Sequence, residues 1–434
     1  MDRPQKGLGE DHRSDWLTLD NAARIYPASL SEWSPDVYRL SVTLKSPVRV
    51  SALQEALRKV FPRFPYFQVH LRRGLFWYYL QRDDEIPELR PLSPVPVSVM
   101  PGPTGTAHLL RVQAGGSTIA VDFSHVLTDG AGAVRFLGTL AVQYLRELGV
   151  EVSSWKPFFD PGRPAAPGEF EDAYNRYFDP DLPGPQRLSP AYHLPDPPRP
   201  FSRVIIGRMP VDGLLALARS RGVSLTDYLV GLYMHSMAQV RVSREDGERA
   251  GGILRVEVPV DMRRLCPSPT MRNFSLYASP EIDLRLGSYG FDEIVSRLHH
   301  SLRLQVSRKE LSRQIARNVR AQRHPLVRAM PLFLKDLAFT AVRKWLGERL
   351  YSGVLTNLGS IEVPGEMAPH IRRFGIMLGP NRLMKSSCAV VSYGEELSIH
   401  FGSVVDSRET ERLFFRHIVG EGVPVKVSER SSGL

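Results

Sequence analysis

Alternating and helical spacings of apolar residues follow one another in the N-terminal part of the chain. Residues 38–44 alternate between apolar and polar, which predicts a strand with one face on the core and the other in water. Residues 51–60 keep a helical apolar stripe, and a Ser-x-x-Gln capping box starts at Ser51. Two hairpins are predicted next, over residues 67–80 and 107–124, because glycine turns separate their apolar runs.

The periodicity stops between residues 155 and 201, where prolines cluster and exclude regular helix or central strand. The mixture of strands and helices then resumes, at 204–209, 213–219, 224–237, 291–302 and 388–404. A chain of 434 residues is too long for one ordinary core. We therefore predict an α/β (α+β) fold of two lobes, residues 1–180 and 181–434, each a mixed sheet flanked by helices.

The chemistry is concentrated in Ser124-His-Val-Leu-Thr-Asp-Gly130, which follows the alternating strand Ile119–Phe123. A period of two places His125 on the same strand face as the apolar residues, so its imidazole is expected in a low-dielectric interior. A buried and oriented imidazole is a candidate general base. Asp129 is a natural N-cap for the apolar helical pattern that follows.

Composition excludes some classes of protein but does not select one function. The chain is 42% hydrophobic and 24% charged, as globular proteins are, and its two cysteines form neither a disulfide framework nor a zinc cluster. His299 and His300 are consecutive and make a poor metal pair, so no metal site is expected. No secretory signal or spanning segment is legible, which predicts a cytoplasmic protein. The net charge of +10 is interpreted first as a general abundance of arginine. If the charge marks a partner, the lack of a nucleic-acid motif favours a small polyanion over nucleic acid.

The H-x-x-x-D-G pattern at 125–130 resembles that of the acyltransferases that include chloramphenicol acetyltransferase, peptide-synthetase condensation domains and alcohol acetyltransferases. Five further stretches resemble the bacterial alcohol acetyltransferase-like branch: 19–27, 74–80, 258–263, 272–277 and 356–359. The plant-type Asp-Phe-Gly-Trp-Gly motif is absent, and Ser124 replaces the first of two histidines found in many condensation domains. The resemblance implies two lobes with a tunnel between them, the histidine midway along it, and a crossover segment near residues 350–380.

The resemblance also implies roles for individual residues. His125 would be the general base that activates an acceptor for attack on an acyl thioester. Asp129 would pair with Arg263 of the second lobe, although the adjacent Arg264 is an alternative, and both would be architectural. The candidates for binding the oxyanion or the substrate are Gly130 by its backbone amide, and Asn273, Ser275, Tyr277 and Asn357 by their side chains. For Asn357, fixing a crossover loop against the first lobe is the favoured role.

The function expected is acyl-CoA-dependent O-acyl transfer, with acetyl-CoA or another acyl-CoA as co-substrate, a small alcohol as acceptor and no tightly bound cofactor. Two alternatives stay open: an N-acyltransferase or condensation enzyme that uses a carrier-protein-bound acyl group, and a non-catalytic protein that binds an acyl or polyketide ligand. Residues 331–350 combine apolar and basic positions, and lying on an anionic membrane is one interpretation. Packing against the segment's own lobe is favoured, so no binding to vesicles is expected.

Overall fold

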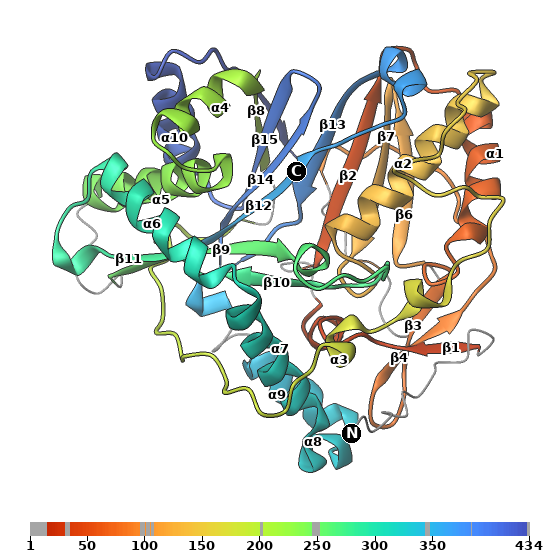
Figure 1. Cartoon of the computed structure of the whole chain (residues 1–434), viewed down its shortest axis with the longest axis horizontal. Coiled ribbons are helices and arrows are strands. Elements are labelled where there is room, and N and C mark those ends of the chain that lie inside the picture. Colours follow the sequence, from red (N-terminus) through yellow and green to blue (C-terminus); the bar gives the residue numbers. More distant parts are fainter. Residues whose placement is uncertain are drawn as a thin grey trace, which may run out of the picture.

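Two large sheets lie side by side in the computed structural model, each with helices on its outer face (Figure 1). The structure describes residues 15–30, 35–95, 100, 105, 108–199, 203–244, 252–342, 348–382 and 384–431. The mixed α/β fold expected from the sequence is confirmed. The lobe boundary near residue 180 stays a prediction.

The first large sheet has five strands and is mostly antiparallel. Its order is β13 (Ile371–Leu378), β2 (Val37–Leu44), β7 (Thr118–Ser124), β6 (Leu110–Gly115) and β5 (Arg90–Pro91). Helices α1 (Val50–Val60) and α2 (Gly130–Glu147) pack together over its outer face. A separate sheet has the order β1 (Trp16–Thr18), β4 (Tyr78–Arg82) and β3 (Val69–Arg73). Strand β13 thus reaches this half from far along the chain and pairs with β2.

The second large sheet has eight strands. Its order is β10 (Ser275–Ala278), β9 (Ile253–Asp261), β12 (Gly353–Ser360), β14 (Ser386–Tyr393), β15 (Glu396–Ser403), β8 (Arg203–Pro210) and β16 (Lys426–Ser431), with β11 (Glu281–Asp283) also pairing β9. Its helices are α4 (Val211–Ser220), α5 (Leu225–Ser243), α6 (Phe291–Gln305) and α10 (Glu409–Gly420). The short α3 (Ala173–Arg176) and the longer α7 (Arg308–Arg323) join the two halves below the sheets.

Most predicted elements are present, and two predictions were wrong. The capping box at Ser51 does not form, because α1 begins one residue earlier, at Val50, with Arg49 as its N-cap. The face of β2 expected in water is partly buried: Arg39 is 1% exposed and its Nε lies 2.6 Å from Asp122 Oδ1. Met377, the cross-strand partner of Arg39 on β13, packs with residues of β8, so the second sheet covers this face.

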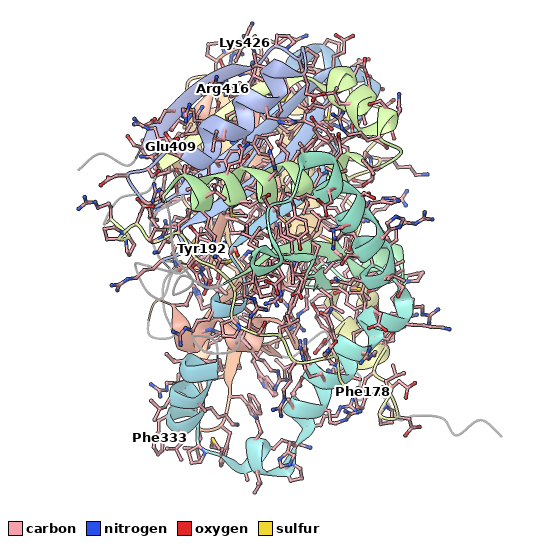
Figure 2. All side chains as sticks on the ribbon, turned by 90° about the vertical axis from the view of Figure 1, so that its left-hand side faces the viewer. Phe178, Tyr192, Phe333, Glu409, Arg416 and Lys426 are labelled. Atoms are coloured by element: carbon pink, nitrogen blue, oxygen red, sulfur yellow. The ribbon has the colours of Figure 1, made fainter. Side chains whose placement is uncertain are left out.

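The prediction that residues 331–350 pack against their own lobe is wrong, because the described part packs on one side against the first lobe. Leu332 N donates to Leu75 O at 2.9 Å, and Lys335 Nζ donates to Phe76 O at 2.8 Å. The described part contains α9 (Leu332–Val342), which follows α8 (Pro325–Ala329) at one end of the molecule (Figures 1 and 2). Leu332 and Lys335 are buried, while Phe333 and Leu337 are 62% and 72% exposed. Residues 343–347 lie outside the described part. None of the described helices combines the length and apolar character that crossing a bilayer requires.

Candidate active site

His125 lies directly after β7, in the turn that leads into α2. Its ring is half-buried and packs against two tyrosines, with centroid separations of 5.5 Å to Tyr26 and 4.5 Å to Tyr38. Its backbone is held on both sides: the amide donates to Asp36 O at 2.9 Å, and the carbonyl accepts from Asn273 Nδ2 at 3.0 Å. The imidazole is therefore oriented and partly open to solvent.

Asp129 ends the same turn and anchors it to the other half of the chain. As predicted, it is the N-cap of α2, with Oδ1 accepting from Gly132 N at 3.3 Å. Its Oδ2 accepts from Phe274 N at 2.7 Å and from Arg263 Nη1 at 2.9 Å. The carboxylate is 5% exposed, so this ion pair is buried. Arg264, the alternative partner, is exposed.

Arg263 is held by more than its ion pair with Asp129. It donates to the carbonyls of Thr270 at 3.0 Å and Arg272 at 2.6 Å, and its Nη1 lies 3.0 Å from Asp261 Oδ1. Burial lowers the pKa of the guanidinium, but the nearby carboxylates of Asp129 and Asp261 outweigh it, so the pKa lies above its ordinary value. The Arg263 side chain is therefore a fixed positive charge that holds the Asp129 carboxylate against residues 261–272.

Two further contacts fix this turn, one to residues 271–274 and one to β2. Thr128 Oγ1 donates to Met271 O at 2.6 Å, and Tyr38 Oη donates to Thr128 O at 3.0 Å. Gly132 permits the close approach, because a Cβ there would lie 2.1 Å from Thr128 Oγ1 and 2.6 Å from Met271 O. The two segments thus fit together without room for another side chain.

Asp20 is a site residue that sequence reasoning missed. It is fully buried, which raises the pKa of its carboxyl, and Arg272 Nε lies 3.8 Å from its Oδ2. Its oxygens accept from Ala23 N at 2.8 Å, and from Asn273 through the amide at 3.3 Å and Nδ2 at 3.0 Å. The 19–27 stretch was noted only as part of the resemblance, and nothing in its spacing indicated this contact.

The predicted oxyanion donors are not all gathered at His125. Asn273 is adjacent, but its Nδ2 already donates to Asp20 and to the carbonyl of His125. Gly130 opens α2, where first-turn amides have no acceptor within their own helix. Ser275 lies on β10, half-buried, and its amide and carbonyl both bond to Tyr174 Oη.

The remaining two candidates are committed to other partners. Tyr277 Oη accepts from Arg317 Nη2 at 3.3 Å, on α7. Asn357 Nδ2 donates to Thr226 Oγ1 on α5 at 3.1 Å, and its Oδ1 accepts from Gly359 N at 2.9 Å. These contacts join Asn357 to α5 and to its own turn, both in the second half of the chain, so a role in fixing the loop against the first lobe stays a prediction.

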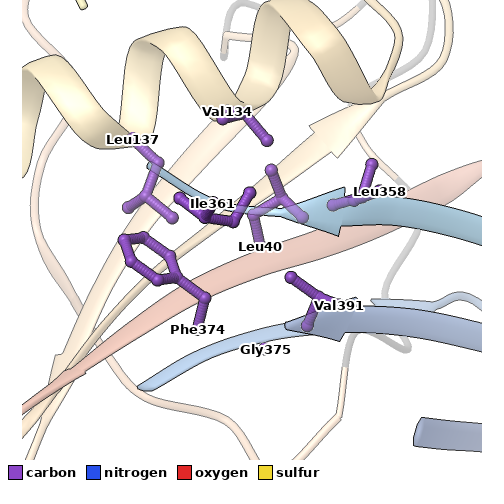
Figure 3. Close-up of a pocket in the computed structure, with 8 residues that line it drawn as sticks. All are labelled: Leu40, Val134, Leu137, Leu358, Ile361, Phe374, Gly375 and Val391. Carbon is purple, nitrogen blue, oxygen red and sulfur yellow. The ribbon is translucent and has the colours of Figure 1, made fainter. Parts of the chain in front are cut away.

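Two cavities flank the start of α2. The first, about 10 Å³, is apolar and has room for about one water (Figure 3). Its lining converges from α2, β2 and the C-terminal strands: Leu40, Val134, Leu137, Leu358, Ile361, Phe374, Gly375 and Val391. The second is an open groove of about 500 Å³ whose lining includes Arg135, Arg176, Arg263 and Arg264. Neither cavity is lined by His125, so the tunnel between the lobes stays a prediction.

Solved structures with this arrangement of sheets cover almost the whole chain. F. sporotrichioides TRI101, complexed with coenzyme A and T-2, is 14% identical over 95% of this chain and 100% of its own, with a TM-score of 0.62. Polyketide synthase associated protein 5 from Mycobacterium tuberculosis is 15% identical over 93% and 96%, with a TM-score of 0.58. The chain has the fold of these proteins. The resemblance expected from the motifs is thus confirmed for the fold.

The X-domain from teicoplanin biosynthesis has this fold too, at 14% identity over 96% of each chain and a TM-score of 0.53. Neither protein-family models nor curated proteins give a match to the sequence. Similarity at 14–15% sequence identity shows the fold and nothing more, so the activity must be argued from the site.

Proposed function

We propose that the protein is an acyl-CoA-dependent O-acyltransferase with His125 as its general base. The observation that carries this proposal is the placement of the His125 ring. It is half-buried between Tyr26 and Tyr38, and its carbonyl is held by Asn273 from the other half of the chain. An imidazole that is fixed but still reachable is what proton abstraction from a bound acceptor requires.

The reaction needs no covalent acyl-enzyme. The neutral imidazole accepts the proton of the acceptor hydroxyl while that oxygen bonds to the thioester carbonyl carbon. The tetrahedral intermediate then collapses, the carbon–sulfur bond breaks, and the leaving thiolate takes the proton from the imidazolium. General-base assistance of this kind contributes about 10²–10⁴ in rate. The products are the acylated alcohol and free coenzyme A thiol.

The Gly130 amide is our candidate for stabilising the oxyanion, because it belongs to the first turn of α2, where the helix dipole favours negative charge. We assign Asn273 a positioning role, since its Nδ2 donates to Asp20 and to the carbonyl of His125. Asp129 and Arg263 are positioning residues as well.

An acyl-CoA donor is supported by two observations. The structure of F. sporotrichioides TRI101, which shares this fold, is complexed with coenzyme A. The open groove beside α2 presents Arg135 and Arg264 on the exposed surface, and guanidinium groups bind phosphates well. A carrier-protein-bound donor and an amine acceptor are variants of the same chemistry.

A non-catalytic protein is the second candidate function. The observation that favours it is that the teicoplanin X-domain, with the same fold, has been solved in complex with OxyB, at a TM-score of 0.51. On this alternative, His125 would line a binding surface and would not take part in proton transfer.

Release of free thiol from acetyl-CoA and longer acyl-CoAs, followed against a panel of alcohols and amines, tests the proposal. We expect turnover with at least one alcohol, and a loss of about 10²–10⁴ in kcat for His125→Ala. His300→Ala is the matched control, because that histidine is exposed on α6. Full turnover by a folded His125→Ala protein would refute the mechanism, and ligand binding without any thiol release would favour the second candidate.

A further inference from the structure

A cluster of two histidines and one carboxylate lies outside the candidate active site. His70 is on β3, Asp83 follows β4, and His108 precedes β6. His70 Nε2 hydrogen-bonds Asp83 Oδ2, and His108 Nε2 lies 3.8 Å from the same oxygen. The two imidazole rings stack, with centroids 5.2 Å apart and planes 12° apart. One ligand atom from each residue lies within 4.8 Å of the other two.

We propose that His70, Asp83 and His108 form a binding site for one divalent transition-metal ion, with Zn²⁺ as the best match. Two imidazoles and one carboxylate are a common donor set for zinc, and solvent supplies the fourth ligand. This proposal is independent of acyl transfer.

Burial supports a site built for a cation. His70 and His108 are 5% and 8% exposed, yet the Nδ1 atom of each is buried without a hydrogen-bond partner among the described residues. Structural histidines normally satisfy both ring nitrogens, so burying this pair costs free energy that coordination of an ion at Nε2 can offset.

The charge and access are also suitable. Asp83 contributes a carboxylate, which is a good oxygen ligand for a divalent ion. Its side chain is 17% exposed, which gives an ion a way in. When the ion binds, neutral His70 takes the tautomer that carries its proton on Nδ1, so that its Nε2 and Asp83 Oδ2 both coordinate the metal.

The fit requires only small movements. Zinc–nitrogen distances of about 2.0–2.1 Å place ligand atoms of a tetrahedral site about 3.3 Å apart. The longer separations, of up to 4.8 Å, must therefore shorten by roughly 1.5 Å or less, and the hydrogen-bonded atoms of His70 and Asp83 must move apart. Side-chain rotation can supply both movements. Because β3 and β4 belong to the three-stranded sheet and β6 to the five-stranded sheet, the ion would tie the two sheets together.

The test uses the full chain without a histidine tag, stripped with EDTA and then equilibrated with Zn²⁺ alone. We expect one equivalent of bound zinc by elemental analysis, and visible ligand-field absorption from a tetrahedral ion when Co²⁺ replaces it. His70→Gln, Asp83→Asn and His108→Gln should each weaken binding at least tenfold. The control is His299→Gln, because His299 Nδ1 pairs with Asp227 at 2.9 Å but has no third ligand among the residues that the structure describes.

Well under one equivalent of bound zinc in the wild-type protein would overturn the proposal. Zinc affinities of all three variants equal to that of the wild-type protein would overturn it as well. If a variant does not fold, the cobalt spectrum of the wild-type protein decides: octahedral, water-like absorption refutes the site.

Discussion

Separating Asp129 from Arg263 tests whether the turn that carries His125 is braced from the other half of the chain. We choose Asp129→Asn, Arg263→Met and the double variant, because asparagine still caps α2 and methionine keeps the packing of the arginine stem. The perturbation therefore removes charge and leaves the shape of the site nearly unchanged.

The magnitude follows from which partners remain. Breaking a buried ion pair costs about 3–5 kcal/mol, because the survivor is left as an uncompensated charge. In Asp129→Asn, Arg263 still bonds to Asp261 at 3.0 Å and to two carbonyls, so the expected loss in the free energy of unfolding is about 3 kcal/mol. In Arg263→Met, the Asp129 carboxylate keeps two backbone N–H donors, from Gly132 and Phe274, so the loss is again about 3 kcal/mol.

The double variant distinguishes a coupled pair from two independent residues. It leaves no buried charge of the pair, so its loss should be about 2 kcal/mol smaller than the sum of the single losses. Urea unfolding at neutral pH, with the denaturant slopes compared, measures all three free energies. In the thiol-release assay, kcat should fall further than KM rises, because the substrate contacts are intact and only the His125 turn is displaced. Strict additivity, or a loss below about 1 kcal/mol for Asp129→Asn, would refute the brace.

Two further predictions concern packing and pH. Gly132→Ala should lower stability by about 1–3 kcal/mol in thermal or urea melts, because its Cβ would clash with Thr128 and with a backbone carbonyl. Gly130→Ala should cost much less stability, because only the flexible tip of the Leu358 side chain is close, at 2.8 Å. Equal losses in the two variants would contradict this reasoning. Glu411 is only 3% exposed, and this burial raises the pKa of its carboxyl from 4.5 to about 7. The unfolded chain therefore releases this proton first, and stability falls as pH rises from about 4.5 to 7, by about 3 kcal/mol at most. Glu411→Gln should flatten that slope in melts at pH 5 and 8 and gain stability at pH 8, whereas an unchanged slope would show that another group causes it.

Local signals predicted the immediate surroundings of His125 well. The alternating run that became β7, the N-cap at Asp129 and the apolar pattern of α2 all lie within one short stretch of chain. Strand, turn and cap propensities act over a few residues, so one stretch of sequence contains the whole signal.

The start of α1 shows where local signals fail. The capping box at Ser51 is a sound local pattern, but the Arg49 amide instead donates to Tyr144 Oη on α2 at 2.9 Å. That bond supplies a tertiary partner for an amide ahead of the predicted cap, and the helix begins at Val50. A contact between residues so far apart leaves no trace in the spacing near Ser51.

The same reason hides the zinc site and the role of Asn273. His70, Asp83 and His108 come from three separate segments with no ligand-like spacing, and they converge only where two sheets meet. The sequence predicts Asn273 as an alternating position of a strand, but β10 begins only at Ser275. The partners of Asn273, Asp20 and His125, are far away in sequence.

Two consecutive residues form hydrogen bonds to the two ends of the turn that carries His125. Asn273 holds the carbonyl of His125, and the amide of Phe274 holds the carboxylate of Asp129. Since Asn273 and Phe274 lead directly into β10 of the second large sheet, any shift between the sheets moves both ends of the turn together. The orientation of His125, the proposed base, thus depends on the contact between the two halves, and changes there should lower kcat before they weaken the affinity for either proposed substrate.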